Sequence, residues 1–493
     1  MESHKNIFSR EAESQQLSKI LESNKSEMVV VYGRRRIGKT FLVREYFSKN
    51  KSGFYFELTG IKDGSTADQL KCFSESFKKY FYPDLDLQKF TNWREAFTKL
   101  NAEINKIHAS KKVILFIDEL PWLATNKSDL LSSIDRYWNT EWSNEKRIKL
   151  ILCGSAASWM IKKVLNSKGG LHNRVTHRLR LEPFNLQQTQ NFLIRSGIHL
   201  DAKKICDLYM MIGGVPYYLS LLKKNLSIMQ NLDQLCFQKS GALSDEISRL
   251  FASLFDDHQI HEQIIHSLAK SWFGLTREQI LKQLQLKSGG WINTKLNELE
   301  EADFITTFVP YGKKNKDKIY VITDPFVRFA KTFLEGQRKQ SITRLSSISK
   351  KPQWFVWAGY SFENICLNHI QSITKSLDLE GQVLWYGPWR YNQQSQLPNA
   401  NKQNETTEKA QIDLVIEGTD DCLRICEIKY TDKEYAFEKD EMDRFLKRVE
   451  LFKKVHKIKK QILLVLITPV GLKETPWSRK HIDLVITLKD LFR

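Results

Sequence analysis

The N-terminal part of the chain alternates short apolar runs with stretches whose apolar residues recur at helical spacing. This alternation is typical of a parallel β-sheet wrapped by helices. The run at residues 113–117 is apolar at every position, as expected of a strand that is buried on both faces. We therefore predict an α/β core within residues 1–230. Its expected strands are residues 28–32, 53–58, 113–117 and 150–153.

The pattern changes in residues 231–345 to short helices followed by a hairpin. We expect helices at 276–284 and 293–302, and strands at 304–308 and 319–322, joined by a lysine-rich segment. Two helices followed by a hairpin predict a winged helix with a basic wing. Winged helices often bind DNA through the second helix. That helix is acidic in its C-terminal half here, so a structural or autoinhibitory role is the alternative.

The remaining residues, 346–493, predict a third domain. A helix at 357–369 precedes alternating strands that include 412–416 and 423–429, and a long charged helix with two apolar strands follows. The segment 392–409 is rich in Asn and Gln and is expected to be a loop or insertion. The predicted fold class is thus α/β, with a parallel sheet, a helical region and a winged helix, followed by a second α/β domain.

Composition excludes several classes of protein. No apolar run in the 493 residues reaches the ~18 that a membrane helix needs, and none follows Met1 as a secretory signal would. Seven scattered cysteines fit a reducing compartment, so we expect a cytoplasmic protein without membrane contact. A net charge of +19 attracts polyanions such as DNA or RNA, although many lysine-rich proteins bind neither.

A phosphate-binding motif, G-x-x-x-x-G-K-[ST], lies between the first predicted strand and an amphipathic helix. Its glycines let backbone N–H groups converge on phosphate oxygens, and the helix N-terminus adds positive charge. Lys39 is expected to reach the β- and γ-phosphates, and the Thr40 hydroxyl to hold Mg²⁺. The residues predicted to bind the nucleotide in this segment are Gly33, Arg34, Arg35, Arg36, Ile37, Gly38, Lys39, Thr40 and Phe41.

Two carboxylates end the third predicted strand. We expect Asp118 to complete the Mg²⁺ shell and Glu119 to polarise the attacking water. The alternative is a strand that merely ends in acidic turn residues. Ser155, at the end of the next strand, is a candidate sensor of the γ-phosphate, or simply a solvated hydroxyl.

A second set of chemically useful residues lies in the C-terminal domain. Glu427 and Lys429 are two positions apart on a strand and therefore share a face, with Asp413 expected beside them. Such carboxylates can bind Mg²⁺, and a neighbouring lysine can orient the attacking water. Glu363 could supply a further carboxylate. The segment 447–460, with seven basic residues and one acidic, would suit a phosphodiester backbone, or be a solvated helix face.

Five motifs of the N-terminal part belong together: Phe8-Ser9-Arg10-Glu11, the Gly33–Thr40 loop, Phe116-Ile117-Asp118-Glu119, Cys153-Gly154-Ser155 and Gly213-Gly214-Val215-Pro216. Together they resemble the archaeal-type P-loop ATPases, a family in the STAND class of AAA+-related switch ATPases.

The resemblance implies ATP rather than GTP as the nucleotide, a base near the N-terminal segment, and a lid opened by Gly214 and Pro216. It also implies an arginine that approaches the γ-phosphate. Arg174 is the candidate, with Arg178 and Arg180 as rivals, because Asn173 stands where the family has glycine.

The order of elements around Glu363, Asp413, Glu427 and Lys429 is similar to the PD-(D/E)xK nuclease superfamily, which has a restriction-endonuclease-like fold. The sequence as a whole predicts an ATP- and Mg²⁺-dependent hydrolase that acts as a switch for a nuclease-like domain on DNA or RNA, with self-association through the ATPase core. The alternatives are an ATPase regulator whose C-terminal fold only binds DNA or protein, and an interaction protein with a structurally held nucleotide.

Overall fold

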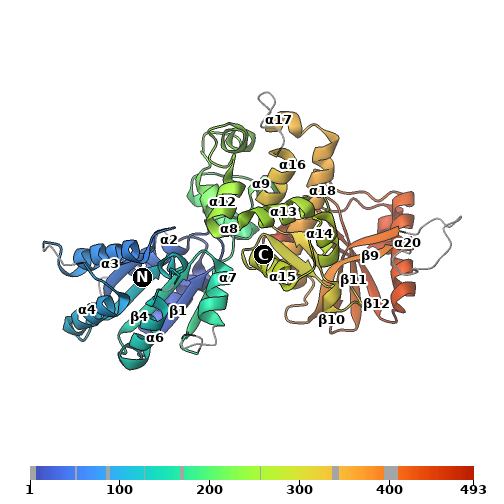
Figure 1. The fold of residues 1–493 in the computed structure, drawn as a ribbon. Helices are drawn as coiled ribbons and strands as arrows, with labels where there is room; N and C mark the ends of the chain where they lie inside the picture. The colour runs from blue at the N-terminus through green and yellow to red at the C-terminus, as the bar shows by residue number, and fades with distance from the viewer. Residues whose placement is uncertain are drawn as a thin grey trace.

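A computed structural model describes residues 7–49, 53–84, 89–126, 128–166, 171, 173–255, 257–335, 344–392 and 409–493. Within these residues the fold is mixed α/β and holds three sheets (Figure 1). Of the predicted polar insertion at 392–409, residues 393–408 lie outside the described residues, and its two end residues belong to strands. No helix in the described part of the chain is long and apolar enough to span a bilayer.

The N-terminal sheet has five parallel strands in the order β2-β3-β4-β1-β5, which confirms the predicted parallel α/β core. Along β3, Ile114 and Phe116 enter one hydrophobic cluster, whereas Val113, Leu115 and Ile117 enter another. The strand is therefore buried on both faces, as its unbroken apolar pattern indicated. The strands are β1 Glu27–Tyr32, β2 Gly53–Thr59, β3 Lys112–Asp118, β4 Ile148–Gly154 and β5 His177–Arg180.

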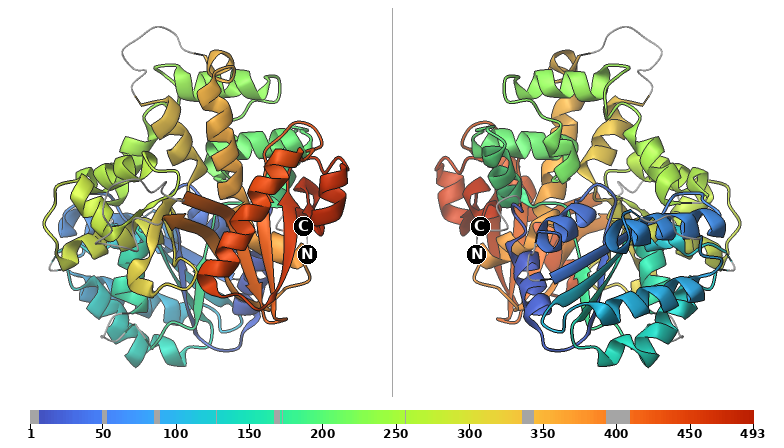
Figure 2. Two further views of the ribbon diagram at one scale, coloured as in Figure 1. Left: turned by 90° about the vertical axis from the view of Figure 1, so that its right-hand side faces the viewer. Right: turned by 90° about the vertical axis from the view of Figure 1, so that its left-hand side faces the viewer.

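Helices cover both faces of this sheet (Figure 2). Apolar residues of α1 and α2 pack on one face, and those of α3, α4 and α6 pack on the other. Two further short helices follow the ends of β3 and β4. The helices are α1 Glu11–Glu22, α2 Lys39–Phe47, α3 Thr66–Phe81, α4 Trp93–Lys106, α5 Leu120–Leu123, α6 Leu130–Thr140 and α7 Ala157–Met160.

A helical region follows β5. Its helices are α8 Leu186–Arg195, α9 Ala202–Ile212, α10 Pro216–Ser220, α11 Ile228–Leu232, α12 Glu246–Leu254 and α13 His258–Ala269.

The two helices and hairpin that the sequence predicts come next. They are α14 Arg277–Gln283, α15 Gly290–Glu301, β7 Ile305–Phe308 and β8 Ile319–Ile322. A short strand, β6 Leu275–Thr276, completes a sheet of order β6-β8-β7, and α16 Pro325–Phe333 follows it. Thr276 caps α14 as its sequence suggests, accepting a hydrogen bond from the Gln279 N–H. α15 begins at Gly290, three residues before the predicted start. The Gly289-Gly290 pair lies at the N-terminus of the helix and is not part of a loop before it.

The C-terminal sheet has the order β13-β12-β11-β10-β9. β9, β10 and β11 are antiparallel, whereas β11, β12 and β13 are parallel. α20 packs on one face of this sheet, and α18 belongs to the cluster on the other (Figure 2). The elements are α17 Leu345–Ile348, α18 Pro352–Asn368, α19 Ile370–Ser376, β9 Val383–Asn392, β10 Lys409–Gly418, β11 Cys422–Ile428, α20 Lys439–His456, β12 Gln461–Ile467, α21 Pro476–His481, β13 Leu484–Ile486 and α22 Leu488–Leu491.

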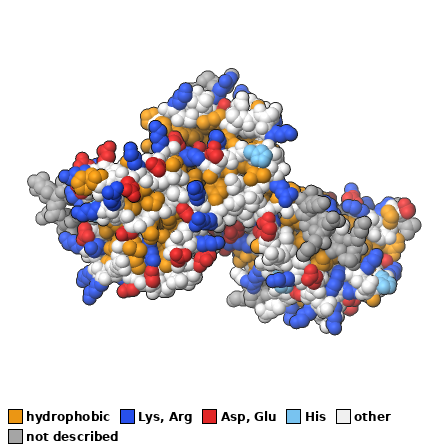
Figure 3. Space-filling view, turned by 180° about the vertical axis from the view of Figure 1, so that it is seen from behind, with side chains coloured by type: hydrophobic (Ala, Val, Ile, Leu, Met, Phe, Trp, Pro, Cys, Tyr) orange, Lys and Arg blue, Asp and Glu red, His pale blue; other side chains and the backbone are white. Residues whose placement is uncertain are grey.

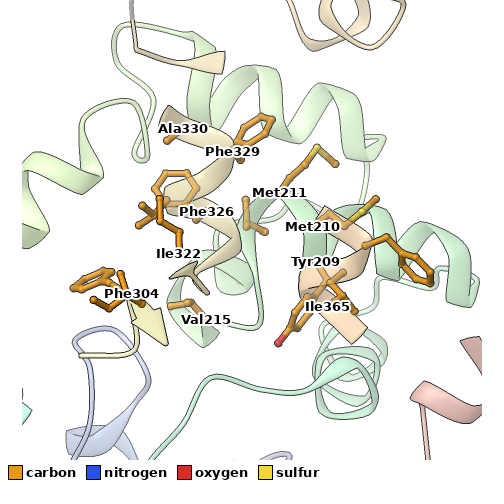
Figure 4. Packing of buried hydrophobic residues seen from close by; sticks show 14 of the residues in the cluster. Tyr209, Met210, Met211, Val215, Phe304, Ile322, Phe326, Phe329, Ala330 and Ile365 are labelled. Carbon is orange, nitrogen blue, oxygen red and sulfur yellow. The ribbon is translucent and has the colours of Figure 1, made fainter. Parts of the chain in front are cut away.

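One hydrophobic cluster extends from Phe184 to Leu491 and joins the helical region, the small sheet and the C-terminal sheet. Figure 4 shows part of it, where α9, α16 and α18 contribute Tyr209, Phe329 and Ile365. The predicted domain boundaries at residues 230 and 345 stay predictions, since this cluster continues across both.

Candidate functional site

The loop between β1 and α2 is shaped by two glycines. Gly38 precedes α2 with φ of 86°, a left-handed conformation that L side chains rarely adopt. Gly33 has φ of 137°, and a Cβ there would lie 2.2 Å from the Leu181 carbonyl oxygen. Side chains at either position would therefore distort the loop. The two glycines of the motif are thus required by the backbone conformation of the loop as well as by phosphate binding.

Lys39 and Thr40 begin α2 at the inner side of this loop. The buried Lys39 Nζ donates to the carbonyls of Gly33 at 3.0 Å and Arg34 at 2.8 Å. Burial lowers the pKa of Lys39, and Asp118 and Glu119 act against that shift. The Thr40 hydroxyl donates to Asp118 Oδ2 at 2.7 Å. Thr40 and the β3 carboxylate therefore meet, and their hard oxygen atoms fit a Mg²⁺ site.

Glu119 follows directly, in the left-handed region with φ of 49°. A non-glycine residue held there costs about 1–3 kcal/mol, a strain that often accompanies function. Ser155 donates to its carboxylate twice, from Oγ at 2.5 Å and from the backbone N–H at 3.2 Å. Ser155 thus lies against the candidate base. Phe41, in the first turn of α2, is 52% exposed.

The lid contacts the loop from the opposite side. The Tyr217 N–H donates to the Arg36 carbonyl at 3.3 Å, one residue after Pro216. Gly214 lets the start of the lid pack closely on the segment after β5, because a Cβ there would lie 1.8 Å from the Phe184 carbonyl oxygen. The Arg36 guanidinium binds both carboxylate oxygens of Glu246, at 2.6 and 3.0 Å, and Glu246 is fully buried. The N-terminal Arg10 also donates to the Ile37 carbonyl at 3.3 Å.

Arg34 and Arg35 point to other parts of the protein. Arg34 forms a buried ion pair with Asp324, which also caps α16 by accepting from the Val327 N–H at 2.7 Å. The Arg35 guanidinium lies 5.5 Å from the ring centre of Trp122. Three consecutive arginines of the loop therefore contact three separate elements.

The structure does not bring Arg174 to this loop. β5 is parallel to β1 and pairs His177 with Val29, whereas the loop follows the opposite end of β1. Arg174, three residues before β5, therefore lies toward the amino end of the sheet, and its side chain is exposed. Of the two rivals, Arg178 is exposed, and Arg180 forms an ion pair with Asp303 at 2.6 Å.

The C-terminal candidate residues lie close together on α18, β10 and β11. Asp413 precedes Leu414, which pairs with Cys426, and its Oδ2 accepts from the Ile428 N–H at 2.9 Å. Burial first, and the neighbouring Glu427 second, raise the pKa of Asp413 to about 6. Burial, followed by the charge of Asp413, also raises the pKa of Glu363 well above its ordinary value. The carboxylates therefore share one electrostatic environment.

Basic groups occupy part of this site. Arg448 of α20 donates to both oxygens of Glu427, each at 3.0 Å, and to the Gln411 carbonyl at 3.1 Å. Lys429 pairs with Glu427 and with Glu441, each at 3.0 Å. Burial opposes the charge of Lys429, but these two carboxylates raise its pKa overall.

A divalent metal does not fit this arrangement. Within the described ranges, no three Asp, Glu, His or Cys side chains lie close enough together to hold one. Glu363, Asp413 and Glu427 are the right kind of ligand, but both oxygens of Glu427 bind Arg448. The three predicted metal ligands are thus neighbours in the structure, but they are not arranged to share one metal ion.

Sequence reasoning missed three residues of these sites. Glu246 and Asp324 bind the loop arginines, and Arg448 binds Glu427. The Asp-Pro-Phe segment at 324–326 was a usable signal for one of them, because an acidic residue before proline is a common helix cap. The sequence offers no comparable signal for Glu246.

The N-terminal fold and site define a class of protein. A buried strand, a glycine loop and a helix present a buried lysine and a threonine beside two strand-end carboxylates, which is the arrangement of a P-loop nucleotide-binding domain.

Comparison with known families agrees with this class. Residues 7–222 match the family described as an ATPase domain predominantly from Archaea. This match supports an archaeal-type ATPase domain, and with it ATP binding and hydrolysis, in that part of the chain.

Individual relatives are more distant. An uncharacterized protein of Methanocaldococcus jannaschii is 27% identical over 384 residues, which cover 77% of this chain and 81% of that protein. A Walker-type ATPase of Pyrococcus abyssi is 17% identical with a TM-score of 0.46, over 67% of this chain and 97% of that one. The ORC2 protein of Aeropyrum pernix, solved in ADPNP–ADP complexes, is 13% identical with a TM-score of 0.34, over 64% and 92%.

Proposed function

We propose that this protein is an ATP-hydrolysing switch whose C-terminal module binds nucleic acid. The observation that carries the proposal is the pair of loop arginines, Arg34 and Arg36, which end on buried carboxylates of the region after β5. A change at the phosphate-binding loop therefore acts directly on residues outside the ATPase domain. Such a link is what a nucleotide-dependent switch requires.

In the hydrolytic step, the loop N–H groups and the Lys39 ammonium bind the phosphate oxygens of ATP. Thr40 and Asp118 would hold Mg²⁺, which when bound neutralises charge on the β- and γ-phosphates. Glu119 accepts a proton from the attacking water, and Ser155 keeps its carboxylate oriented through the 2.5 Å hydrogen bond.

The loop also has a short path to the C-terminal site. Asp324, the partner of Arg34, follows Thr323, whose carbonyl accepts from Asn364 at 2.9 Å and from Asn368 at 3.1 Å. Asn364 is adjacent to Glu363 on α18. Displacement of Asp324 would therefore be passed to the helix that carries one of the candidate carboxylates, which supports coupling between the two sites.

The predicted winged helix fits the switch better than a DNA-reading module. Its second helix, α15, lies against α7 of the ATPase domain, and Asp303 at its end binds Arg180. A helix covered in this way is not free to enter a major groove. We therefore propose an autoinhibitory role for it, in a STAND-class protein that acts in the cytoplasm and self-associates through its ATPase core.

Replacing Glu119 with glutamine is expected to stop hydrolysis while ATP still binds. The amide keeps the volume and the contact with Ser155 but cannot take a proton from water, so kcat should fall about 10²- to 10⁴-fold. Phosphate release measures the rate, and a fluorescent ATP analogue measures binding. Glu141→Gln, an exposed change in the same domain, is the control. Unchanged phosphate release in Glu119→Gln would show that another group is the base.

The nucleic-acid part of the proposal rests on a basic groove of about 450 Å³ beside the C-terminal carboxylates. Figure 3 shows lysine and arginine side chains scattered among acidic ones on its visible face, so overall charge alone does not locate a binding surface. The groove concentrates basic groups on α20 and at the end of β11. It is lined by Glu427, Lys429, Glu441, Arg444, Lys447 and Arg448.

Replacing Arg444 and Lys447 together with glutamine is expected to weaken nucleic-acid binding at least tenfold at low salt. Two lost phosphate contacts should also reduce the slope of log affinity against log salt by about 2. Fluorescence anisotropy with labelled single- and double-stranded DNA and RNA at several salt concentrations measures both. The exposed pair Lys162→Gln and Lys163→Gln on the ATPase domain is the matched control. Equal affinity for both double variants would contradict the groove assignment.

A second candidate is a C-terminal module that binds nucleic acid without cleaving it. The contact between Arg448 and Glu427 favours it, because that contact takes a carboxylate from the nuclease-like set. Cleavage by the wild type in Mg²⁺ or Mn²⁺, absent from a variant with Asp413→Ala and Glu427→Ala, would assign the nuclease. Binding without cleavage would assign this second candidate.

A further inference from the structure

One part of the basic groove is already neutral. The Lys429 ammonium lies 3.0 Å from Glu427 and 3.0 Å from Glu441, and the Arg448 guanidinium lies 3.0 Å from Glu427. All four of these side chains line the groove. Their two positive and two negative charges cancel, so this part offers no excess positive charge to an anion, and its carboxylates repel a phosphate that comes close.

The other two lining residues, Arg444 and Lys447, are free. Both are exposed on α20, and within the described part of the chain neither side chain takes part in an ion pair or a hydrogen bond. They are three positions apart on the helix, which places their Cβ atoms about 5–6 Å from each other on one face. Two long basic side chains at that distance can reach the same phosphate group. The excess positive charge of the groove is therefore concentrated at one point.

The lining of the groove differs from that of a track for an unbroken strand. Surfaces that bind a continuous single strand combine basic residues along the backbone with aromatic side chains that stack on the bases. In the described structure, every side chain that lines this groove is charged. Its volume of about 450 Å³ is also in the range of a pocket for one small group. The groove therefore suits a phosphate better than it suits a run of bases.

A phosphate at the end of a strand matches the two free cations better than one inside the strand. A phosphodiester carries one negative charge. A terminal phosphomonoester carries about 1.5 to 2 negative charges at pH 7 and presents three acceptor oxygens. A guanidinium and an ammonium both bind such oxygens through charge-assisted hydrogen bonds. A strand that continued through the groove would also bring its next phosphate toward the carboxylates of Glu427 and Glu441.

We propose that the groove binds the phosphorylated end of a nucleic-acid strand, with Arg444 and Lys447 on one terminal phosphomonoester. The inference rests on the nucleic-acid binding proposed above and names the part of the nucleic acid that the groove takes. A phosphomonoester has the same chemistry at a 5′ end and at a 3′ end, and the experiment distinguishes the two. The C-terminal module then recognises an end and not a base sequence.

Fluorescence anisotropy with the full chain, in EDTA and without ATP, tests the inference. The probes are single-stranded DNAs of one sequence, labelled internally, with a 5′ phosphate, a 3′ phosphate, neither phosphate, or the ends joined into a circle. A further unphosphorylated strand, two nucleotides longer, has nearly the charge of a phosphorylated strand and controls for charge alone. We expect one of the two phosphorylated strands to bind about tenfold or more tightly than the unphosphorylated, the longer and the circular strands.

The double variant with Arg444→Gln and Lys447→Gln should lose this preference. Arg479→Gln, which removes an exposed arginine paired with Glu474, should keep it. Equal affinity for the phosphorylated strands and the longer unphosphorylated strand, or for the phosphorylated strands and the circle, would overturn the inference. Displacement by thymidine monophosphate at the affinity of the phosphorylated strand would also overturn it, because a mononucleotide and not a strand end would then be the ligand.

The same measurements separate this inference from the proposed function. If the double variant weakens the binding of all the strands by the same factor, the groove binds nucleic acid without regard to its ends. The proposed function would then stand and the inference would fail. If no strand binds to the wild type, both fail.

Discussion

Lys39→Ala is expected to reduce ATP hydrolysis to background and to weaken ATP binding. The ammonium is buried inside the loop, with Nζ 3.0 and 2.8 Å from two loop carbonyls. Alanine removes a charge that faces the phosphates in the ground state and the transition state, so kcat/KM should fall by about 10² or more. A coupled phosphate-release assay measures hydrolysis, and calorimetry with ATP and Mg²⁺ measures affinity.

Lys99→Ala is the matched control for this change, because Lys99 is an exposed lysine on α4 of the same domain. It should hydrolyse ATP at the wild-type rate. Turnover retained in Lys39→Ala would remove the assignment of the loop as the catalytic nucleotide site, whatever the binding result.

Asp324→Asn is expected to be the most destabilising of the conservative changes. Asparagine keeps the shape of the side chain and can still cap α16, but it leaves the Arg34 guanidinium buried without its charged partner. Breaking a buried ion pair from one side typically costs about 3–5 kcal/mol in the free energy of unfolding. A fall in the urea midpoint, followed by circular dichroism and tryptophan fluorescence, measures the loss.

Asp201→Asn is the control that separates the effect of losing a buried ion pair from the effect of changing a helix cap. Asp201 caps α9 through the Lys204 N–H at 2.8 Å, but its ion pair with Lys204 is exposed and worth about 0–1 kcal/mol. Its midpoint should stay close to that of the wild type. A second variant, Arg34→Met with Asp324→Asn, removes both charges of this pair and should recover most of the loss. A midpoint for Asp324→Asn equal to that of Asp201→Asn would show that the buried pair contributes little.

The parts of this protein that a single sequence predicts well are the local ones. The phosphate-binding loop is eight consecutive residues whose glycines, lysine and threonine act within one turn of chain and helix. The apolar run of β3 indicates burial on both faces of the strand from its own residues alone. The alternation of β11 likewise placed Glu427 and Lys429 on one side, 3.0 Å apart in the structure.

What the sequence could not predict depends on distant partners. Arg34 and Asp324 are 290 positions apart, and Arg36 and Glu246 are 210 apart, so no local pattern connects them. Arg448 could be counted among the basic residues of 447–460, but not paired with Glu427. Arg174 is a candidate because of the family resemblance, which implies an arginine near the γ-phosphate, whereas the parallel direction of β5 places Arg174 toward the end of the sheet opposite the loop.

The chain passes only once from the ATPase sheet to the elements that follow it, because β5 ends at Arg180 and the next hydrophobic cluster begins at Phe184. Arg10 holds this connection by donating to the Glu182 carbonyl at 2.7 Å. The ion pairs of Arg34 with Asp324 and of Arg36 with Glu246 also link the two sides. A rotation of the later elements away from the sheet would have to break both ion pairs, so the loop that binds phosphate would also control that rotation.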